Sequence, residues 1–281
     1  MKFAAALFTN LVLAAAALAA PRGRGLAERV KARGLFAHLS HPLLPDLSDL
    51  LNGDHDRENT AHGANVQYSG NWAGAVIESP PPGQTFNEVS AVFTVPNPSA
   101  ASGSVGGSSA ASAWVGIDGD TYQNAILQTG VDFTVDSFGS VSYNAWYEWY
   151  PDYAYDFSGI SISAGDVISL SVIASSNSQG TVVIENQTQG QKVTQALSAP
   201  SPSSTLAGQN AEWIIEDFQQ NGQLVPFANF GTVLFNDTVA KTSSQTLGAN
   251  GATILEMRQN GQILTEVTIP SASQVQVQYK G

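Results

Sequence analysis

Short runs of β-branched and aromatic residues, separated by turn-forming residues, fill the chain from about residue 69 to its end. Clusters of Gly, Ser, Asn and Pro interrupt these runs, and almost no stretch has the apolar spacing of a helix. The pattern predicts an all-β fold, an antiparallel β-sandwich. The expected strands are Trp72–Ile77, Val89–Val95, Ala113–Ile117, Ala125–Phe133, Ser142–Tyr150, Val167–Ala174, Thr181–Asn186, Gln191–Ala196, Ala211–Ile215, Val233–Phe235, Ala252–Met257 and Glu266–Ile269.

Residues 1–19 have the features of a secretory signal peptide. Lys2 precedes an apolar run, and Ala17-Leu18-Ala19 supplies the small residues of a cleavage site. The run is short for a membrane anchor, and no later stretch reaches the length of a transmembrane span. We therefore expect a secreted, extracellular protein with no membrane partner.

Residues 20–63 differ in charge from the rest of the chain. Of 11 Lys and Arg residues, seven lie in the first 60 positions, whereas 17 of 23 acidic residues follow residue 60. Leu26–Leu39 has apolar residues at helical spacing and a basic face. One interpretation is a solvated basic helix in a disordered tail. The charge contrast favours a partly helical propeptide, in which Arg22–Arg33 inhibit the acidic domain of residues 64–281 and release it in acid.

The composition of the domain excludes several classes of function. Its acidic character argues strongly against a nucleic-acid partner, because phosphate binding needs a basic face. The chain has no cysteine, and its four histidines all lie at or before His62, which excludes Ser-His-Asp and Cys-His catalysis and histidine-ligated zinc. We expect no metal and no cofactor, so carboxylates and amides must do any chemistry. Because few cationic groups repel one another in acid, we also expect stability at low pH.

Three further expectations concern the surface. Asn186 and Asn236 begin N-glycosylation sequons, which are meaningful because the chain is expected to be secreted. Ser198–Gly208 has the composition of an exposed loop. No association motif is evident, so a monomer is expected.

Side chains of a strand point alternately to its two faces, so residues two apart share a face. In four expected strands this alternation separates a mostly apolar face from a face that mixes acids, an amide and tryptophan. In neighbouring strands the mixed faces would merge into an acidic groove floored by indole rings. The alternative is the solvent face of an ordinary amphipathic sheet, although such faces favour Thr, Ser and Lys. The mixed face contains Trp114, Asp118, Gln128, Asp132, Trp146, Glu148, Glu212 and Glu216.

Five stretches, in this order, resemble the eqolisin family of glutamic peptidases. The similarity runs from about residue 70 to at least residue 235, with Ala73 where family members have glycine and without the cysteines that many of them carry. The resemblance implies an acid endopeptidase on a lectin-like sandwich of two large antiparallel sheets, acting on protein and peptide substrates. The stretches are Asn71-Trp72, Ala113–Asp120, Ala125–Phe133, Ala145–Pro151 and Ala211–Phe218.

The resemblance also implies roles for individual residues. The catalytic glutamine and glutamate of the family correspond to Gln128 and Glu216, and the hairpin loop Asp152–Ser158 corresponds to a mobile loop over the cleft. No role is implied for Asp217. The groove-lining, substrate-binding positions correspond to Trp72, Trp114, Asp118, Asp132 and Glu148.

In this interpretation Glu216 is the general base that activates water, and Gln128 holds the water and donates to the developing oxyanion. Two alternatives come from other functional classes. A glycoside hydrolase would use a carboxylate pair such as Glu148 and Glu216, and it gives no role to Gln128. A non-catalytic lectin would use the tryptophans for stacking.

Overall fold

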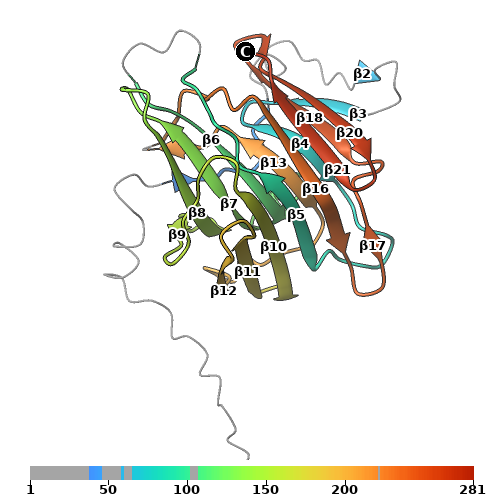
Figure 1. The fold of residues 1–281 in the computed structure, drawn as a ribbon. Coiled ribbons are helices and arrows are strands. Elements are labelled where there is room, and N and C mark those ends of the chain that lie inside the picture. Colours follow the sequence, from blue (N-terminus) through green and yellow to red (C-terminus); the bar gives the residue numbers. More distant parts are fainter. Residues whose placement is uncertain (1–37, 46–57, 60–64, 102–106, 221) are drawn as a thin grey trace, which may run out of the picture.

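A computed structural model describes residues 38–45, 58–59, 65–101, 107–220 and 222–281 (Figure 1). All regular secondary structure within these ranges is β-strand, which confirms the all-β prediction. The expected signal peptide and most of the expected propeptide lie outside the described residues. The helix expected at residues 26–39 is wrong at its end, because His38–Leu39 form strand β1.

Ten strands form the larger sheet, and its centre carries the mixed face. All its pairings are antiparallel except that of β18 with β3. In spatial order the strands are β2 (Glu58–Asn59), β3 (Asn65–Ser69), β18 (Thr253–Gln259), β4 (Trp72–Ile77), β13 (Ala211–Glu216), β6 (Ser109–Ile117), β7 (Ile126–Val135), β8 (Val141–Tyr150) and β9 (Tyr155–Asp156), with β19 (Gln262–Ile263) beside β18.

Eight strands form the second large sheet, and a small three-stranded sheet joins β1 to the body of the protein. The order in the second sheet is β12 (Gln191–Ser198), β11 (Gln179–Asn186), β10 (Val167–Ser176), β5 (Glu88–Thr94), β16 (Thr232–Lys241), β21 (Gln274–Tyr279) and β20 (Thr265–Ser271), with β17 (Thr246–Leu247) beside β16. In the small sheet β14 (Gln219–Gln220) lies between β1 and β15 (Gln223–Leu224).

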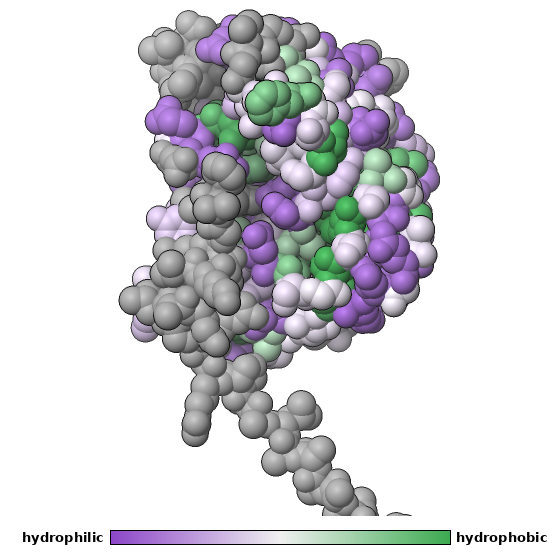
Figure 2. Space-filling model, turned by 60° about the vertical axis from the view of Figure 1, so that its left-hand side comes forward, coloured by the Kyte–Doolittle hydropathy of each residue, from purple (hydrophilic) through white to green (hydrophobic). Residues whose placement is uncertain are grey.

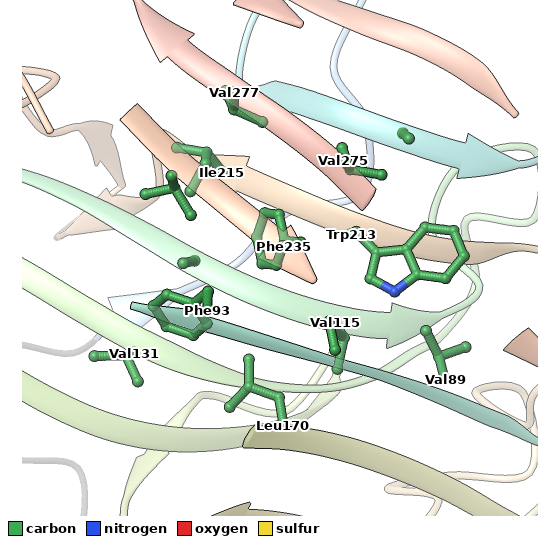
Figure 3. Close-up of a cluster of buried hydrophobic side chains, with 14 of the residues drawn as sticks. Val89, Phe93, Val115, Val131, Leu170, Trp213, Ile215, Phe235, Val275 and Val277 are labelled. Atoms are coloured by element: carbon green, nitrogen blue, oxygen red, sulfur yellow. The ribbon is translucent and has the colours of Figure 1, made fainter. Parts of the chain in front are cut away.

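The two large sheets lie face to face and enclose the main hydrophobic core (Figures 1 and 3). Strand β10 contacts β6 and β7 across the interface, and β5 contacts β6 and β13. Figure 3 shows Val115, Val131 and Trp213 from the ten-stranded sheet packed against Phe93 and Phe235 from the other sheet. Removing this apolar surface from water is the main stabilising contribution to the sandwich.

Every strand expected from the sequence overlaps an observed strand, with ends that differ by up to six residues, the largest difference being at the end of β16. The sequence reasoning missed β21, although Val275 and Val277 alternate there with glutamines and both are buried. It also missed β3, which reaches the sheet through a parallel pairing that no local pattern encodes.

The surface offers little continuous apolar area on the face seen in Figure 2, where hydrophobic residues occur in small groups among hydrophilic ones. Within the described ranges there is no helix long and apolar enough to cross a membrane.

Of the two sequons, the structure argues against Asn186. Its side chain is fully buried, and its Nδ2 donates to the carbonyl of Ser161 at 2.8 Å and to Asp166 Oδ2 at 2.7 Å. A glycan would replace one of the two hydrogens on this nitrogen, so at least one of these bonds would be lost, and the buried side chain leaves no room for a sugar. Asn236 is half-buried, and its Nδ2 makes one longer hydrogen bond, 3.3 Å, to the carbonyl of Leu234.

Candidate active site

The pairing register gathers the mixed face onto five adjacent strands of the ten-stranded sheet, on the side away from the main core. Residues directly opposite one another across these strands form three rows. The first row is Trp72, Glu216, Ser112, Asp132 and Asn144; the second is Gly74, Ile214, Trp114, Gly130 and Trp146; and the third is Val76, Glu212, Gly116, Gln128 and Glu148.

The indole rings of the second row lie over glycines. A Cβ on Gly130 would stand 2.6 Å from Trp114 Cβ and 2.9 Å from Trp146 Cζ2. A Cβ on Gly116 would stand 2.8 Å from Trp114 Cζ3. Because these positions have no side chain, the tryptophans lie flat along the sheet and floor the groove.

Glu216 is the last residue of β13, and its two carboxylate oxygens have different partners. Nε1–H of Trp114 donates to Oε2 at 2.9 Å, and the backbone N–H of His41 donates to Oε1 at 3.1 Å. The indole therefore fixes the orientation of the carboxylate and leaves Oε1 directed at the peptide chain that crosses it.

Gln128 and Glu148 lie opposite each other on β7 and β8, and both are fully buried. Nε2 of Gln128 donates to Oε2 of Glu148 at 3.4 Å, and the backbone N–H of Ser40 donates to the same oxygen at 3.3 Å. Burial raises the pKa of Glu148 well above its ordinary value, and the charge of Glu216 raises it further. Glu148 therefore contacts Gln128 directly and also interacts electrostatically with Glu216.

A segment of the chain itself, residues 38–45, lies over the mixed face, where the groove was expected. It pairs with the edge of β14 through His38–Leu39, and it then passes over the carboxylates of Glu148 and Glu216. The side chain of Leu43 packs against the apolar cluster that contains Trp72 and Trp114. The charge contrast predicted a propeptide over this region, but the residues that contact the carboxylates were not predicted.

Asn71 is a further groove residue whose role the sequence analysis missed. Its Oδ1 accepts the backbone N–H of Leu44 at 2.8 Å, and its Nδ2 lies 3.3 Å from the carbonyl oxygen of His41. Its place directly before Trp72, within a stretch that resembles the eqolisins, was the only signal available.

Two other predicted groove residues, Trp72 and Asp132, are buried on the same face. The ring of Trp72 packs edge-on against Trp114, with 4.9 Å between the ring centroids. Among the described residues, Trp72 Nε1 has no hydrogen-bond partner. Asp132 lies opposite Ser112 and Asn144, and its charge contributes to raising the pKa of Glu148.

Asp118 has surroundings that do not support the substrate contact expected for it. It is fully buried, with φ at 68°, and its oxygens accept the backbone N–H groups of residues 207–210 at 2.7 to 3.3 Å. These bonds anchor the end of the segment Ser198–Gly208, whose expected exposure is also wrong in part, because Ser204 and Leu206 are buried. Asp118 therefore holds the backbone of residues 207–210 in place.

Two further buried acids lie in β13 and directly after its end. Glu212 is fully buried, neither of its carboxylate oxygens has a partner among the described residues, and burial raises its pKa well above the ordinary value. Asp217 accepts a hydrogen bond from Gln259 Nε2, and burial raises its pKa to about 8. In the described part of the chain, no group of three or more His, Cys, Asp or Glu residues is arranged to hold a metal ion.

The hairpin after β8 packs onto the edge of the sheet. Tyr155 pairs with Tyr147 through β9, and the two rings stack with 5.8 Å between their centroids. The mobility expected for Asp152–Ser158 stays a prediction.

Comparison with known sequences identifies the family. Residues 70–279 match the sequence model of the Peptidase A4 family. The chain is 43% identical to aspergillopepsin-2 of Aspergillus niger, in an alignment that covers 99% of this chain and 100% of the relative. It is 42% identical to scytalidopepsin B of Scytalidium lignicola, with 96% of each chain covered.

Solved structures agree with this relationship. A structure of scytalido-glutamic peptidase with a transition-state-analogue inhibitor superposes with a TM-score of 0.66 at 41% identity, covering 75% of this chain and 98% of the other. Aspergilloglutamic peptidase from Aspergillus niger superposes with a TM-score of 0.58 at 50% identity, covering 61% of this chain and 99% of the other. The chain therefore belongs to the Peptidase A4 family, the eqolisins, and is a glutamic-type endopeptidase that acts on protein and peptide substrates.

Proposed function

We propose that Gln128 and Glu216 form the catalytic dyad of a secreted acid endopeptidase that is made as a zymogen. The observation that supports this most directly is the seating of residues 40–41 of the chain in the groove. The main chain of this segment lies against Glu216 and against Glu148, the hydrogen-bond partner of Gln128. A substrate peptide in the same place would bring a peptide bond to these side chains.

In the proposed reaction Glu216 is the general base. Its Oε1 takes a proton from a water molecule as the water oxygen forms a bond to the carbonyl carbon of the scissile peptide bond. The carbon–nitrogen bond then breaks, and the proton passes from Glu216 to the departing nitrogen. The products are a carboxylic acid and an amine, and Glu216 is returned to its ionised form.

Gln128 supplies the amide that stabilises the developing negative charge on the carbonyl oxygen. A neutral side-chain N–H is suited to this role because it donates at every pH at which the enzyme works. With the segment bound, that N–H is directed to Glu148, and among the described residues Oε1 of Gln128 has no partner.

The crowding of carboxylates favours a single negative charge in the site, which suits an acidic working range. Glu148 and Glu216 interact in a buried site, so ionising both together carries a high energetic cost. With Glu148 protonated, Glu216 is able to carry the single negative charge that a general base requires.

The zymogen proposal rests on the same segment. Residues 38–45 cover Glu216 and Glu148, so a substrate has no access to them while the segment is bound. We assign residues 1–19 to a signal peptide, 20–63 to a propeptide that inhibits the enzyme, and 64–281 to the peptidase domain. We further propose that the mature enzyme is an extracellular monomer and that Asn236 is its candidate glycan site. A glycosidase or lectin is not favoured, because the family and the curated relatives are peptidases.

The Glu216→Gln variant tests the dyad, because it keeps the shape of the side chain and removes the base. We expect it to lose proteolysis at every acidic pH with an unchanged circular-dichroism spectrum. Gln128→Ala should lower kcat by about 10²–10³-fold, as loss of an oxyanion donor does in other enzymes. Gln187→Ala, at an exposed position in the turn between β11 and β12, is the control. Wild-type proteolysis by Glu216→Gln would refute the assignment.

A further inference from the structure

The turn between β3 and β4 presents a cluster of polar groups to the segment in the groove. At this turn the backbone N–H of Gly70 donates to the carbonyl oxygen of Leu44 at 2.9 Å. The hydroxyl of Ser69 donates to the same oxygen at 3.2 Å. These contacts involve only main-chain atoms of the segment, so they do not depend on its side chains.

Asn71 makes the largest set of these contacts. Its Oδ1 accepts the N–H of Leu44, and its Nδ2 lies 3.3 Å and 3.5 Å from the carbonyl oxygens of His41 and Pro42. One amide side chain thus contacts the main chain of residues 41, 42 and 44. Among the described residues, both partners of Nδ2 belong to the segment.

Asn71 is fully buried when the segment is bound. A buried amide donor needs a partner, because a buried donor without a hydrogen bond destabilises the protein. Once the segment leaves the groove, Nδ2 loses the carbonyl oxygens of His41 and Pro42 and turns to water or to another peptide. A substrate peptide offers the same carbonyl and N–H groups.

The order of these contacts along the segment shows on which side of the two carboxylates Asn71 binds the chain. Ser40 and His41 donate to Glu148 and Glu216, and the chain then continues through Pro42 and Leu43 to Leu44. Asn71 therefore binds residues that follow, in the N-to-C direction, those in contact with the carboxylates.

We propose that Asn71 is a substrate-binding residue that holds the main chain of the substrate on the C-terminal side of the scissile bond. The proposal rests on the dyad proposed above and on substrates that run through the groove in the direction of the segment. Ser69 and Gly70 complete this main-chain site. Because the site binds backbone groups, it favours long substrates over short ones without selecting their sequence.

The test is a series of peptide substrates of one sequence, lengthened one residue at a time on the C-terminal side of the scissile bond, with the acid-activated enzyme. For the wild type we expect kcat/KM to rise once the peptide reaches Asn71. In Asn71→Ala this gain should fall by about 10-fold, mainly through KM, as expected for one or two lost hydrogen bonds. The loss in Asn71→Ala should be larger for long substrates than for the shortest ones.

Two further variants separate binding from folding. Asn71→Asp keeps the acceptor for the N–H and removes the donor, so it should lose part of the gain and carries the test if Asn71→Ala does not fold. Asn186→Ala removes an equally buried amide in the eight-stranded sheet, so it should lower Tm while keeping the dependence on substrate length. As a measurement without catalysis, a synthetic peptide of residues 38–45 should bind Asn71→Ala about 10-fold more weakly.

Several results would overturn the inference. They are a wild-type enzyme that gains nothing from C-terminal extension, an Asn71→Ala enzyme that loses equal activity on short and long substrates, and unchanged binding of the peptide. Each of these leaves the inactivity of Glu216→Gln unaffected. Failure of the dyad itself shows instead as activity in Glu216→Gln, so the two failures are distinguishable.

Discussion

Nε1–H of Trp114 donates to Oε2 of Glu216 at 2.9 Å, inside the face that carries Gln128. The bond joins neighbouring strands, β6 and β13, and both side chains are fully buried. A tryptophan that floors the groove therefore also orients the proposed base, so packing and catalysis share one residue.

Trp114→Phe should keep the aromatic floor and lose this orientation. A hydrogen bond to a charged group contributes about 1.5–3 kcal/mol, so we expect kcat to fall about 10-fold to 100-fold with KM little changed. The control is Trp149→Phe, because Trp149 donates its Nε1–H to the carbonyl of Ser204 on the core side of the sheet. That variant should lower Tm and leave kcat unchanged. Equal kcat for Trp114→Phe and the wild type would show that the bond does not orient the base.

Gly130→Ala should disturb the same site through packing. The new methyl group would lie 2.5 Å from the carbonyl oxygen of Ala113 and 2.6 Å from Trp114 Cβ, and overpacking of this kind costs about 1–3 kcal/mol. We expect both Tm and kcat to fall, because Trp114 must shift relative to Glu216. Gly107→Ala is the matched control, since a methyl group there would meet nothing within 4 Å. A Gly130→Ala enzyme with wild-type kcat contradicts the prediction.

A synthetic peptide of residues 38–45 should inhibit the acid-activated enzyme at pH 6.5 and lose potency as the pH falls. Burial lowers the pKa of His41. Its ring faces Tyr150 and Gln219, and its backbone N–H donates to Glu216. A histidine whose pKa is lowered on binding favours the bound state above its ordinary value of 6.5, and this contribution is lost as the pH falls and the free peptide takes up a proton.

The histidine is tested by replacing it within the peptide. A peptide with His41→Phe should retain more of its potency in acid, because it has no group that protonates at this position. A second peptide, residues 22–33, tests whether the basic stretch also inhibits, as its charge suggests. If the two 38–45 peptides lose potency in parallel, His41 is not the group that senses pH.

The peptidase domain should be more stable in acid than at neutral pH. Burial raises the pKa of Glu212 well above its ordinary value, that of Asp217 to about 8, and those of Asp120 and Glu256 to about 7. A carboxyl group with a raised folded-state pKa binds a proton more tightly in the folded than in the unfolded state. Its stabilising contribution is therefore complete below the unfolded pKa, 3.8 for Asp and 4.5 for Glu, and is lost as the pH rises towards the folded value.

Thermal unfolding of the inactive Glu216→Gln protein, followed by circular dichroism, measures this dependence without self-digestion. We expect Tm to be highest near pH 4 and to fall progressively up to about pH 8. Glu212→Gln in the same background should reduce the difference in Tm between pH 4 and pH 8, because it removes one buried ionisable group. A Tm that rises from pH 4 to pH 8, or a domain that unfolds near pH 3, is the opposite of this expectation.

The local pattern of the sequence was sufficient for much of the fold and for the composition of the mixed face. Alternation along β6, β7, β8 and β13 depends only on backbone geometry, so the faces of Gln128 and Glu216 followed from their positions in the chain. The absence of cysteine, and of histidine after His62, likewise restricted the chemistry to carboxylates and amides.

Only the tertiary structure decided which of these polar residues meet. Asp118 has the parity of a groove residue, yet the backbone amides of residues 207–210 surround its carboxylate. The contacts of Ser40 with Glu148 and of His41 with Glu216 join residues 108 and 175 positions apart. Alternation within a strand is a local property and can be predicted locally. The course of a segment across a groove depends on the twist of the sheet and the packing of distant loops, which no single stretch of sequence contains.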